Sequence, residues 1–422
     1  MTDRPSFRLR IFNLVEPVTS MYPDLIPYWR SLGWQVETVI SKTQYRAKRP
    51  QRWVVHCSSV HWTPSFGLRH RRSPGKLLIM LAYIIYAGLL SLIGPRVDHN
   101  LFLTQPPLFF VWGVVLQRLR SQPFTIVLMD LYPDVAIQAG LLTQEGLLTG
   151  LLLRLSRYGL QRADKVIAIG RCMEKRLLAL GLDDSRIKVI PNWVDETAIV
   201  PLFRTENSFR YQMGWQDKFV VMYSGNIGIS HNFTDILEVA RRLKKNSELV
   251  FVFVGDGRRW PEIEYFITKH RLSNIKRLPF QPQSQLAQSL GAGDLHFICL
   301  RPGFAGLVVP SKTYGVLAAG RPILFQGEKA GEIARLIDEE DVGQIVTPGD
   351  TTGLEKAILR YLNDPFLLQR QGENGRRLAE GRYSKQAAQQ AYTALFAPAS
   401  IAQISSLLSS NDLLSPDPEP HK

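Results

Sequence analysis

Short apolar runs alternate with amphipathic segments along almost the whole chain. This alternation is typical of β–α units around a parallel sheet. Runs such as TIVLM at 125–129 are continuously apolar, as expected for strands that are buried on both faces. The pattern predicts strands in the first half at 9–15, 36–40, 100–104, 125–129, 165–169 and 188–190, and in the second half at 219–223, 249–254, 275–278, 295–300 and 323–325.

The two series of strands predict two α/β domains. The chain has 422 residues, and a domain usually holds about 100–200 residues, so each half is long enough to bury its own core. We expect a first domain over 1–195, a linker over 196–217 where neither period is present, and a second domain over 218–383. The Ser/Leu-rich end at 399–422 finishes in PDPEP and predicts a mobile tail without chemistry.

Charge is distributed unevenly between the two halves. The chain is 45% hydrophobic with a net charge of +14, which excludes a disordered chain and a small disulfide scaffold. Residues 1–200 carry 25 basic and 14 acidic side chains (+11), whereas 201–422 carry 26 and 23 (+3). Residues 38–97 contain ten Lys or Arg and no Asp or Glu. We therefore expect an anionic partner at the first domain, although a solvated face with a chance charge bias is the alternative.

The uncharged segment 77–95 follows the basic run RHRRSPGK. A membrane-spanning helix needs about 20 apolar residues, so three alternatives stay open: a span, a helix buried in the first domain, or a helix lying in a membrane interface. The Arg, Lys and Trp side chains before the segment suit anionic headgroups. Nucleic acid is a rival partner, but no nucleic-acid-binding motif accompanies these charges, and we expect none to bind.

The cysteines indicate the compartment. Cys57, Cys172 and Cys299 lie more than a hundred residues apart without a C-x-x-C pair, which favours a reducing cytoplasm and excludes a zinc ribbon. The apolar stretch at 9–15 contains Arg10 and Asn13 and predicts a strand, not a signal peptide. We therefore expect a cytoplasmic protein that is peripherally associated with the inner face of the plasma membrane.

The first strand–helix turn of the second half reads YSGNIG at 223–228. Glycines let a backbone approach a ligand closely, and free N–H groups at a helix start favour phosphate, although tight turns also use glycine for steric reasons alone. The chain contains no G-x-x-x-x-G-K-[ST] loop, and its first strand is not followed by G-x-G-x-x-G. Nucleoside triphosphate hydrolysis and nicotinamide chemistry are therefore disfavoured.

Two further cations lie near predicted strand ends. Arg301 follows the strand at 295–300, and Pro310-Ser311-Lys312 begins a helix that closes at Gly320. Ser311 is a candidate N-cap, whereas a lysine in the first turn opposes the helix dipole. An anion bound beside Lys312 would remove that conflict.

The order of these motifs resembles the retaining GT-B glycosyltransferases of family 4, in particular the bacterial branch that builds capsule, exopolysaccharide or O-antigen chains. The resemblance covers roughly residues 8–397. It rests on LMDLYPD at 128–134, ADKVIAIG at 163–170, KVIPNWVD at 188–195, YSGNIG at 223–228, VGDG at 254–257, VVPSKTYGVLAAGRP at 308–322 and GENGRRLAEGRYS at 372–384.

The resemblance implies two Rossmann-like domains with parallel sheets that face one another across a cleft. A nucleotide-sugar donor, a UDP- or GDP-sugar, would bind mainly to the second domain and a lipid-linked saccharide acceptor to the first. A last helix at 384–398 would cross back to the first domain. The donor is a substrate, so no cofactor is expected, and a metal is not expected because no Asp-x-Asp pair ends a strand.

Individual residues are carried over from the family's motifs. Gly225, Asn226, Ile227 and Gly228 resemble the donor-diphosphate loop. The resemblance implies donor contacts for Gly255, Ser311, Lys312, Tyr314 and Gly315. It implies catalytic roles for Asp130, His231, Arg301 and Lys312, the last three as sources of positive potential at the leaving diphosphate. Asp130 is either an acceptor-positioning residue or an N-cap for the helix after Pro133.

On the donor side, the chain departs from the family pattern at three places. The stretch at 229–232 lacks the usual Arg and Lys after the loop, so His231 is the nearest group able to carry a charge. Leu307 and Gly315 occupy the positions of two usual glutamates, of which the later one binds the donor ribose. Two alternatives to a transferase therefore remain: a nucleotide-sugar 2-epimerase of the same fold, and a GT-B relative that binds or scaffolds with weak catalysis.

Overall fold

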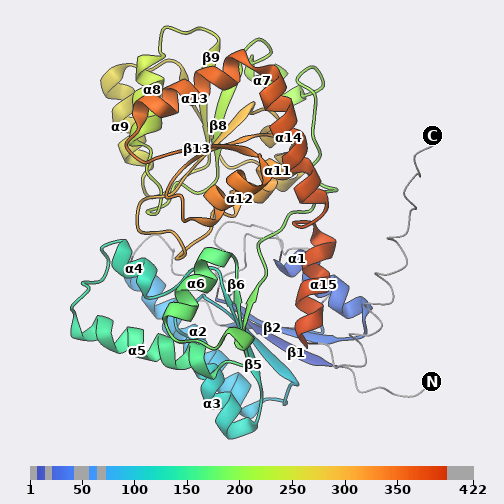
Figure 1. The fold of residues 1–422 in the computed structure, drawn as a ribbon. Helices are drawn as coiled ribbons and strands as arrows, with labels where there is room; N and C mark the ends of the chain where they lie inside the picture. Colours follow the sequence, from blue (N-terminus) through green and yellow to red (C-terminus); the bar gives the residue numbers. More distant parts are fainter. Residues whose placement is uncertain (1–6, 15–20, 42–56, 64–72, 397–422) are drawn as a thin grey trace, which may run out of the picture.

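The computed structural model describes residues 7–14, 21–41, 57–63 and 73–396. Within these ranges the strands form two sheets, one with the order β3-β2-β1-β4-β5-β6-β7 and the other with the order β10-β9-β8-β11-β12-β13. Neighbouring strands in both sheets are parallel. Figure 1 shows the two α/β domains one above the other, which confirms the predicted pair of Rossmann-like domains.

The first sheet contains β1 (Arg8–Phe12), β2 (Gln35–Ser41), β3 (Ser59–Thr63), β4 (His99–Leu103), β5 (Phe124–Leu128), β6 (Lys165–Ala168) and β7 (Ile187–Val189). The second contains β8 (Phe219–Ser224), β9 (Leu249–Val254), β10 (Ile275–Leu278), β11 (Leu295–Cys299), β12 (Ile323–Gln326) and β13 (Gly343–Val346). Each predicted run forms a strand. The pattern missed β3 and β13 because SVHWT is a mixed, half-buried edge strand and GQIV is too short to show a period.

The helices of the first domain are α1 (Met21–Ser31), α2 (Ser73–Ile93), α3 (Val111–Arg120), α4 (Asp134–Gln138), α5 (Leu147–Arg162) and α6 (Arg171–Ala179). Those that follow are α7 (Ser208–Met213), α8 (Thr234–Arg242), α9 (Trp260–His270), α10 (Leu286–Gly291), α11 (Lys312–Ala318), α12 (Glu332–Glu340), α13 (Thr351–Asn363), α14 (Pro365–Glu380) and α15 (Lys385–Phe396).

The predicted linker at 196–217 is wrong in its second part. It contains α7, and the Arg210 side chain of this helix is completely buried against the second domain. Arg210 pairs with Asp294 at 3.1 Å and donates to the carbonyl of Ala292 at 2.8 Å. A six-residue helix is too short for a helical period, so the sequence pattern could not show it.

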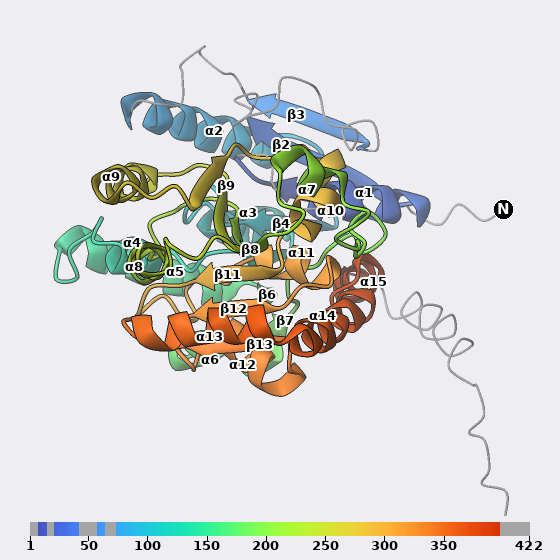
Figure 2. The same ribbon diagram turned by 90° about the horizontal axis from the view of Figure 1, so that it is seen from above.

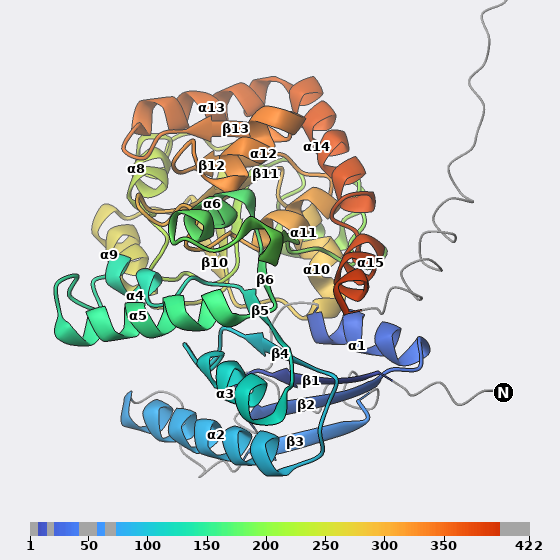
Figure 3. The same cartoon turned by 60° about the horizontal axis from the view of Figure 1, so that its bottom comes forward.

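The last helix, α15, packs on the first domain against α1 (Figure 3). Gln389 donates to the carbonyl of Asp24 at 2.8 Å, and the Trp29 indole donates to Thr393 at 3.0 Å. The chain therefore returns to its first domain, as the resemblance implies. The tail predicted at 399–422 lies outside the described residues, as does much of the acid-free segment at 38–97.

The apolar segment 77–95 forms most of α2. Ile79, Tyr83 and Ala87 are buried on its inner side, while Ile85 and Ile93 are exposed on its outer side. The strands β3 before it and β4 after it belong to one sheet, so the spanning alternative is wrong. Among the described residues, no helix has the length and apolarity that crossing a membrane requires.

Candidate active site

The turns that follow β8 and β9 lie against each other at the carboxyl ends of the strands of the second sheet. Gly225 has φ +138° and Gly255 has φ +128°, conformations that favour glycine. A Cβ on Gly255 would lie 2.2 Å from the carbonyl oxygen of Gly225, and a Cβ on Gly225 would lie 3.2 Å from Cε of Lys312. The glycines are therefore needed where two backbones and a lysine side chain meet.

Lys312 reaches this turn from the start of α11. Its Nζ lies 3.8 Å from the ring centroid of Tyr223, donates to the Tyr223 hydroxyl and lies 3.4 Å from Nε2 of His231. The Tyr223 hydroxyl donates in turn to the carbonyl of Asn226 at 2.7 Å. Among the described residues no carboxylate pairs with this ammonium. Burial lowers the pKa of Lys312 to about 7.

His231 does not supply the positive charge expected of it. Burial, reinforced by the charge of Lys312, lowers its pKa well below the usual value, so the imidazole is neutral near pH 7. A charged Lys312 has no lone pair, so Nε2 of His231 must accept from it, and Nδ1–H then donates to the carbonyl of Gly228 at 3.3 Å. The other tautomer accepts from Gly228 N–H at 3.1 Å and requires a neutral Lys312.

Arg301 holds the loop that carries His231. Its backbone N–H donates to the carbonyl of Ser230 at 2.8 Å, and its guanidinium donates to the carbonyl of Ile229 at 3.2 Å. Arg259 donates to the carbonyl of His231 from the other side. Of the three predicted cationic groups, the structure brings Lys312 and His231 together at the turn, while the Arg301 guanidinium contacts the loop backbone.

The remaining predicted donor residues surround α11. Ser311 is at the N-cap position, but its side chain makes no capping hydrogen bond, so the predicted cap is wrong. Tyr314 is buried, with its ring 5.0 Å from that of Tyr383. A Cβ on Gly315 would meet Leu290 at 3.2 Å, and Leu307 is buried. Neither position offers a carboxylate to a ribose.

Asp130 lies where the two domains touch. It forms an antiparallel bridge with Val308, and the next N–H, of Leu131, donates to the carbonyl of Leu307 at 2.9 Å. Burial raises the pKa of Asp130 to about 6. The N-cap of α4 is Pro133 without a side-chain hydrogen bond, so the capping alternative for Asp130 is wrong. Asp130 therefore remains as a candidate side chain at the boundary between the domains.

A second interdomain contact was not predicted. Arg171, at the start of α6, donates to Glu332 at 3.0 Å and to both oxygens of Glu339 at 2.8 and 2.9 Å. Arg176 donates to the carbonyl of Ala305 at 2.8 Å. The sequence offered no signal for these pairs because the partners lie more than a hundred residues apart.

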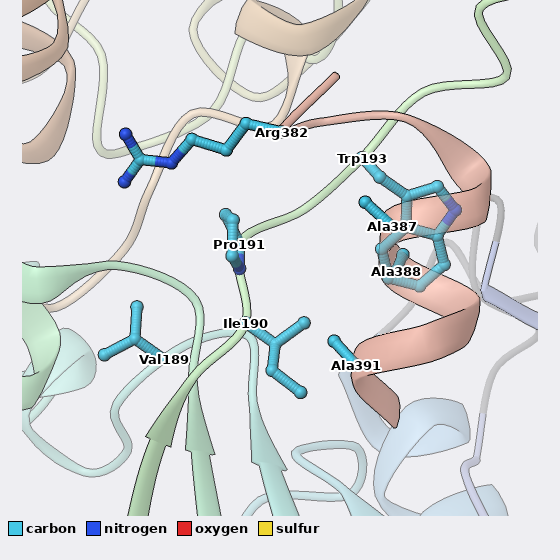
Figure 4. Close-up of a pocket in the computed structure, with 8 residues that line it drawn as sticks. All are labelled: Val189, Ile190, Pro191, Trp193, Arg382, Ala387, Ala388 and Ala391. Atoms are coloured by element: carbon cyan, nitrogen blue, oxygen red, sulfur yellow. The ribbon is translucent and has the colours of Figure 1, made fainter. Parts of the chain in front are cut away.

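Figure 4 shows a pocket where α15 crosses to the first domain. It is lined by Val189, Ile190, Pro191, Trp193, Arg382, Ala387, Ala388 and Ala391. The lining is apolar apart from Arg382 and does not include the turn at 225–228. No group of three or more His, Cys, Asp or Glu within the described ranges is placed to hold a metal ion.

Comparison with known proteins decides the family. Residues 21–193 match the family described as "Glycosyl transferase 4-like domain", and residues 206–378 match "Glycosyl transferases group 1". The probable glycosyltransferase WbjE of Pseudomonas aeruginosa is 30% identical over 286 residues, which are 68% of this chain and 71% of that protein. The chain belongs to the family 4 glycosyltransferases.

Other relatives agree with this assignment. The "Putative colanic acid biosynthesis glycosyl transferase WcaI" of Escherichia coli K12 is 26% identical over 287 residues, 67% of this chain and 69% of that protein. Among solved structures, sucrose-phosphate synthase of Thermosynechococcus elongatus superposes with a TM-score of 0.73 at 16% identity, over 96% of this chain and 100% of that one. HepE of Anabaena in complex with UDP gives 0.68 at 17%, with the same coverage. The GT-B fold of this glycosyltransferase is thereby confirmed.

The sequence of this glycosyltransferase did not point to Tyr223 as a residue of the site. Tyr223 is the last buried position of β8, where its apolar neighbours suggested only a core residue. Its place directly before the SGNIG turn was the available signal. The structure shows that its ring and hydroxyl hold Lys312 against the turn.

Proposed function

We propose that this glycosyltransferase moves a sugar from a UDP- or GDP-sugar, with retention and without a metal ion, to a lipid-linked saccharide. The reaction would serve cell-surface polysaccharide biosynthesis, such as exopolysaccharide, at the cytoplasmic face of the membrane. The observation that carries the proposal is Lys312: an enclosed cation without a described carboxylate partner, held against the glycine turn at 225–228. A donor diphosphate is the anion that the family 4 architecture provides for this place.

The donor side follows from that geometry. The bond between the sugar C1 and the diphosphate oxygen breaks, and negative charge develops on the departing diphosphate. A positioned ammonium and backbone N–H groups stabilise such charge most where water is excluded. Lys312 would contact the diphosphate, while the neutral His231 and the Tyr223 hydroxyl hold the ammonium in place. The WcaI and HepE names, which mention colanic acid and UDP, support the polysaccharide role and the nucleotide.

The acceptor side centres on Asp130. An acceptor hydroxyl would attack the sugar C1 from the same face that the diphosphate leaves. The new bond between C1 and the acceptor oxygen forms as the bond between C1 and the diphosphate oxygen breaks, and the hydroxyl proton passes to the departing phosphate oxygen. The Asp130 carboxylate would hold the acceptor by accepting a hydrogen bond from one of its hydroxyls. Its location at the interdomain boundary suits that positioning role.

A binding panel tests the donor assignment. UDP, GDP and their common sugar conjugates are titrated calorimetrically into the wild type, Lys312→Met and, as a matched control, Lys356→Met, whose lysine is exposed on α13. We expect one nucleotide class to bind the wild type and the control, and binding to Lys312→Met to be weakened about 100-fold. No binding to the wild type at millimolar nucleotide would overturn the proposal and favour a scaffold.

The products of the reaction distinguish a transferase from the alternative, a nucleotide-sugar 2-epimerase. A donor incubated with enzyme but no acceptor should return unchanged apart from slow hydrolysis. A sugar inverted at C2 would identify the epimerase instead.

A further inference from the structure

Three helices of the first domain lie side by side on one face of its sheet. α2 contacts α3, and α3 contacts α5, and Figure 3 shows the three together to the left of the strands of the first sheet. Their inward side chains, such as Tyr83, Val114 and Leu160, enter one core cluster. The opposite face of the sheet is covered by α1 and α15. The outward sides of α2, α3 and α5 therefore form a single outer layer, called here the outer helical face.

The outer helical face carries large apolar side chains in unusual density. Of the 20 exposed large hydrophobic residues among those described, 11 belong to these three helices. They are Leu77, Leu78, Leu81, Ile85, Leu89 and Ile93 on α2, Leu119 on α3, and Leu147, Leu148, Leu151 and Leu155 on α5. Leu147 is 96% exposed and Ile93 is 81% exposed. Large exposed apolar side chains gathered on neighbouring helices indicate an interaction site.

The charges of the same face have one sign. The sequences of α2, α3 and α5 contain no Asp or Glu. Arg154 and Arg157 are exposed on α5, and none of the ion pairs among the described residues includes them. Arg118 and Arg162 flank the Tyr158 ring at 5.9 and 5.7 Å. Leucines interspersed with arginines and an aromatic ring match the interface of an anionic bilayer.

We infer that the outer helical face docks this enzyme on an anionic lipid bilayer, with the leucines of α2 and α5 entering the headgroup–acyl boundary. The inference deepens the proposed function, because a lipid-linked acceptor presents its saccharide at that boundary. The path of the chain supports this inference. Asp130 lies between β5 and α4, and the loop after α4 leads to Leu147, the first residue of α5. The docking helix and the acceptor-side carboxylate are thus joined through one short helix.

A second copy of the chain fits this face poorly. A symmetric dimer through it would place the arginines of one copy against those of the other, with no carboxylate from any of the three helices to separate them. An anionic bilayer supplies many negative headgroups and an apolar layer at the same time. The charge and the apolarity of the face are therefore both satisfied by lipid.

Vesicle flotation with the full chain tests the inference. Vesicles of phosphatidylglycerol with phosphatidylcholine, and of phosphatidylcholine alone, are compared at low and high salt. The variants are Leu147→Gln with Leu148→Gln, and Arg154→Glu with Arg157→Glu. The matched controls are Phe366→Gln, where the side chain is 84% exposed on α14, and Arg360→Glu on α13. None of these residues belongs to the site.

We expect the wild type and both controls to float with anionic vesicles at low salt and to be released as salt rises, because screening shortens electrostatic attraction from about 10 Å at 0.1 M to about 3 Å at 1 M. Each face variant should bind about tenfold less. Equal flotation of variants and wild type, no flotation of the wild type at low salt, or a change in oligomeric state without a change in flotation would each overturn the inference.

Donor binding by the same variants, measured without vesicles, keeps this result apart from the proposed function. Face variants that bind a nucleotide as the wild type does, but no longer float, support docking alone. A wild type that floats normally and binds no nucleotide defeats the proposed function and leaves the docking face standing.

Discussion

The outer helices of the two domains differ although both domains share one architecture. On α8 and α14 of the second domain, arginines pair with a glutamate of the same helix: Arg241 and Arg242 with Glu238 at 2.7 and 3.3 Å, and Arg376 with Glu380 at 2.7 Å. In the first domain, the outer helical face has exposed arginines and leucines and no carboxylate. Viewed from above, α2 and α13 lie at opposite edges of the molecule (Figure 2). These arginines of α8 and α14 are therefore neutralised locally, whereas the outer helical face of the first domain is basic and apolar.

The unpaired charge of the two domains is also placed differently. In the first domain it is spread over exposed side chains, where it attracts an extended anionic surface over about a Debye length. The second domain also holds a lysine, Lys312, that is enclosed by Tyr223 and His231. A single enclosed cation recognises one anionic group at close range. This difference supports the proposed roles, surface attraction for the first domain and diphosphate binding for the second.

The largest expected effect is loss of transfer on removing Lys312. Lys312→Met keeps most of the length of the side chain and removes the charge, so kcat/KM should fall about 100- to 1000-fold, as when one positioned donor is lost from an anion-stabilising site. Initial rates of nucleotide release in the presence of acceptor measure it. The combined Arg154→Glu and Arg157→Glu variant, assayed with a soluble acceptor, should keep its rate within about twofold. A rate loss of similar size in both variants would break the comparison.

The next effect concerns Asp130. Asp130→Asn should lower kcat about 10- to 100-fold through misplacement of the acceptor while leaving donor affinity unchanged. Burial raises the pKa of this carboxyl to about 6, so the wild-type rate should fall as the pH drops below 6 and the carboxylate is protonated. The Asn variant should lack that acid limb. A variant that retains the limb would assign it to another group.

The pH dependence of donor binding tests the enclosed lysine directly. The pKa of Lys312 is lowered to about 7, so above pH 7 the free protein holds a neutral amine and must take up a proton to bind a diphosphate. The donor Kd should rise about tenfold per pH unit above 7, measured by calorimetry in buffers of different ionisation enthalpy. Lys312→Met should show no such uptake.

The same shift affects the stability of the free protein. An unfolded chain keeps the lysine protonated up to about pH 10.4, so between pH 7 and 10.4 the unfolded state binds one more proton than the folded state. The Lys312 contribution to the free energy of unfolding is therefore unfavourable below pH 7 and is relieved as pH rises through this window. Thermal unfolding of the wild type and Lys312→Met across pH 7–9 should converge.

The sequence predicted the scaffold better than the site. Continuous apolar runs and their order were enough for the two parallel sheets, because buried parallel strands leave a periodic signal. The contact between Lys312 and Tyr223 left none, since the two residues are 89 positions apart and meet only through strand order. The neutrality of His231 depends on burial, which one sequence does not display. Likewise, the composition pointed to a basic first domain, but only the structure gathered α2, α3 and α5 into one face.

The smallest expected effect concerns the ion pairs that join the two domains. Arg171 of α6 bonds Glu332 and Glu339 of α12 and so favours the closed arrangement in which Asp130 touches the 307–308 backbone. Because the pair with Glu339 is partly exposed, Arg171→Ala should lower kcat/KM only about two- to fivefold. Added salt should lower the kcat/KM of the wild type toward that of the variant. Arg335→Ala, whose distance to Glu339 is 3.9 Å within α12, serves as the control and should leave the rate unchanged. A wild-type rate that does not depend on salt would contradict this prediction. The contact between the two domains would then rest on the Leu131–Leu307 hydrogen bond and on apolar packing, without a contribution from ion pairs.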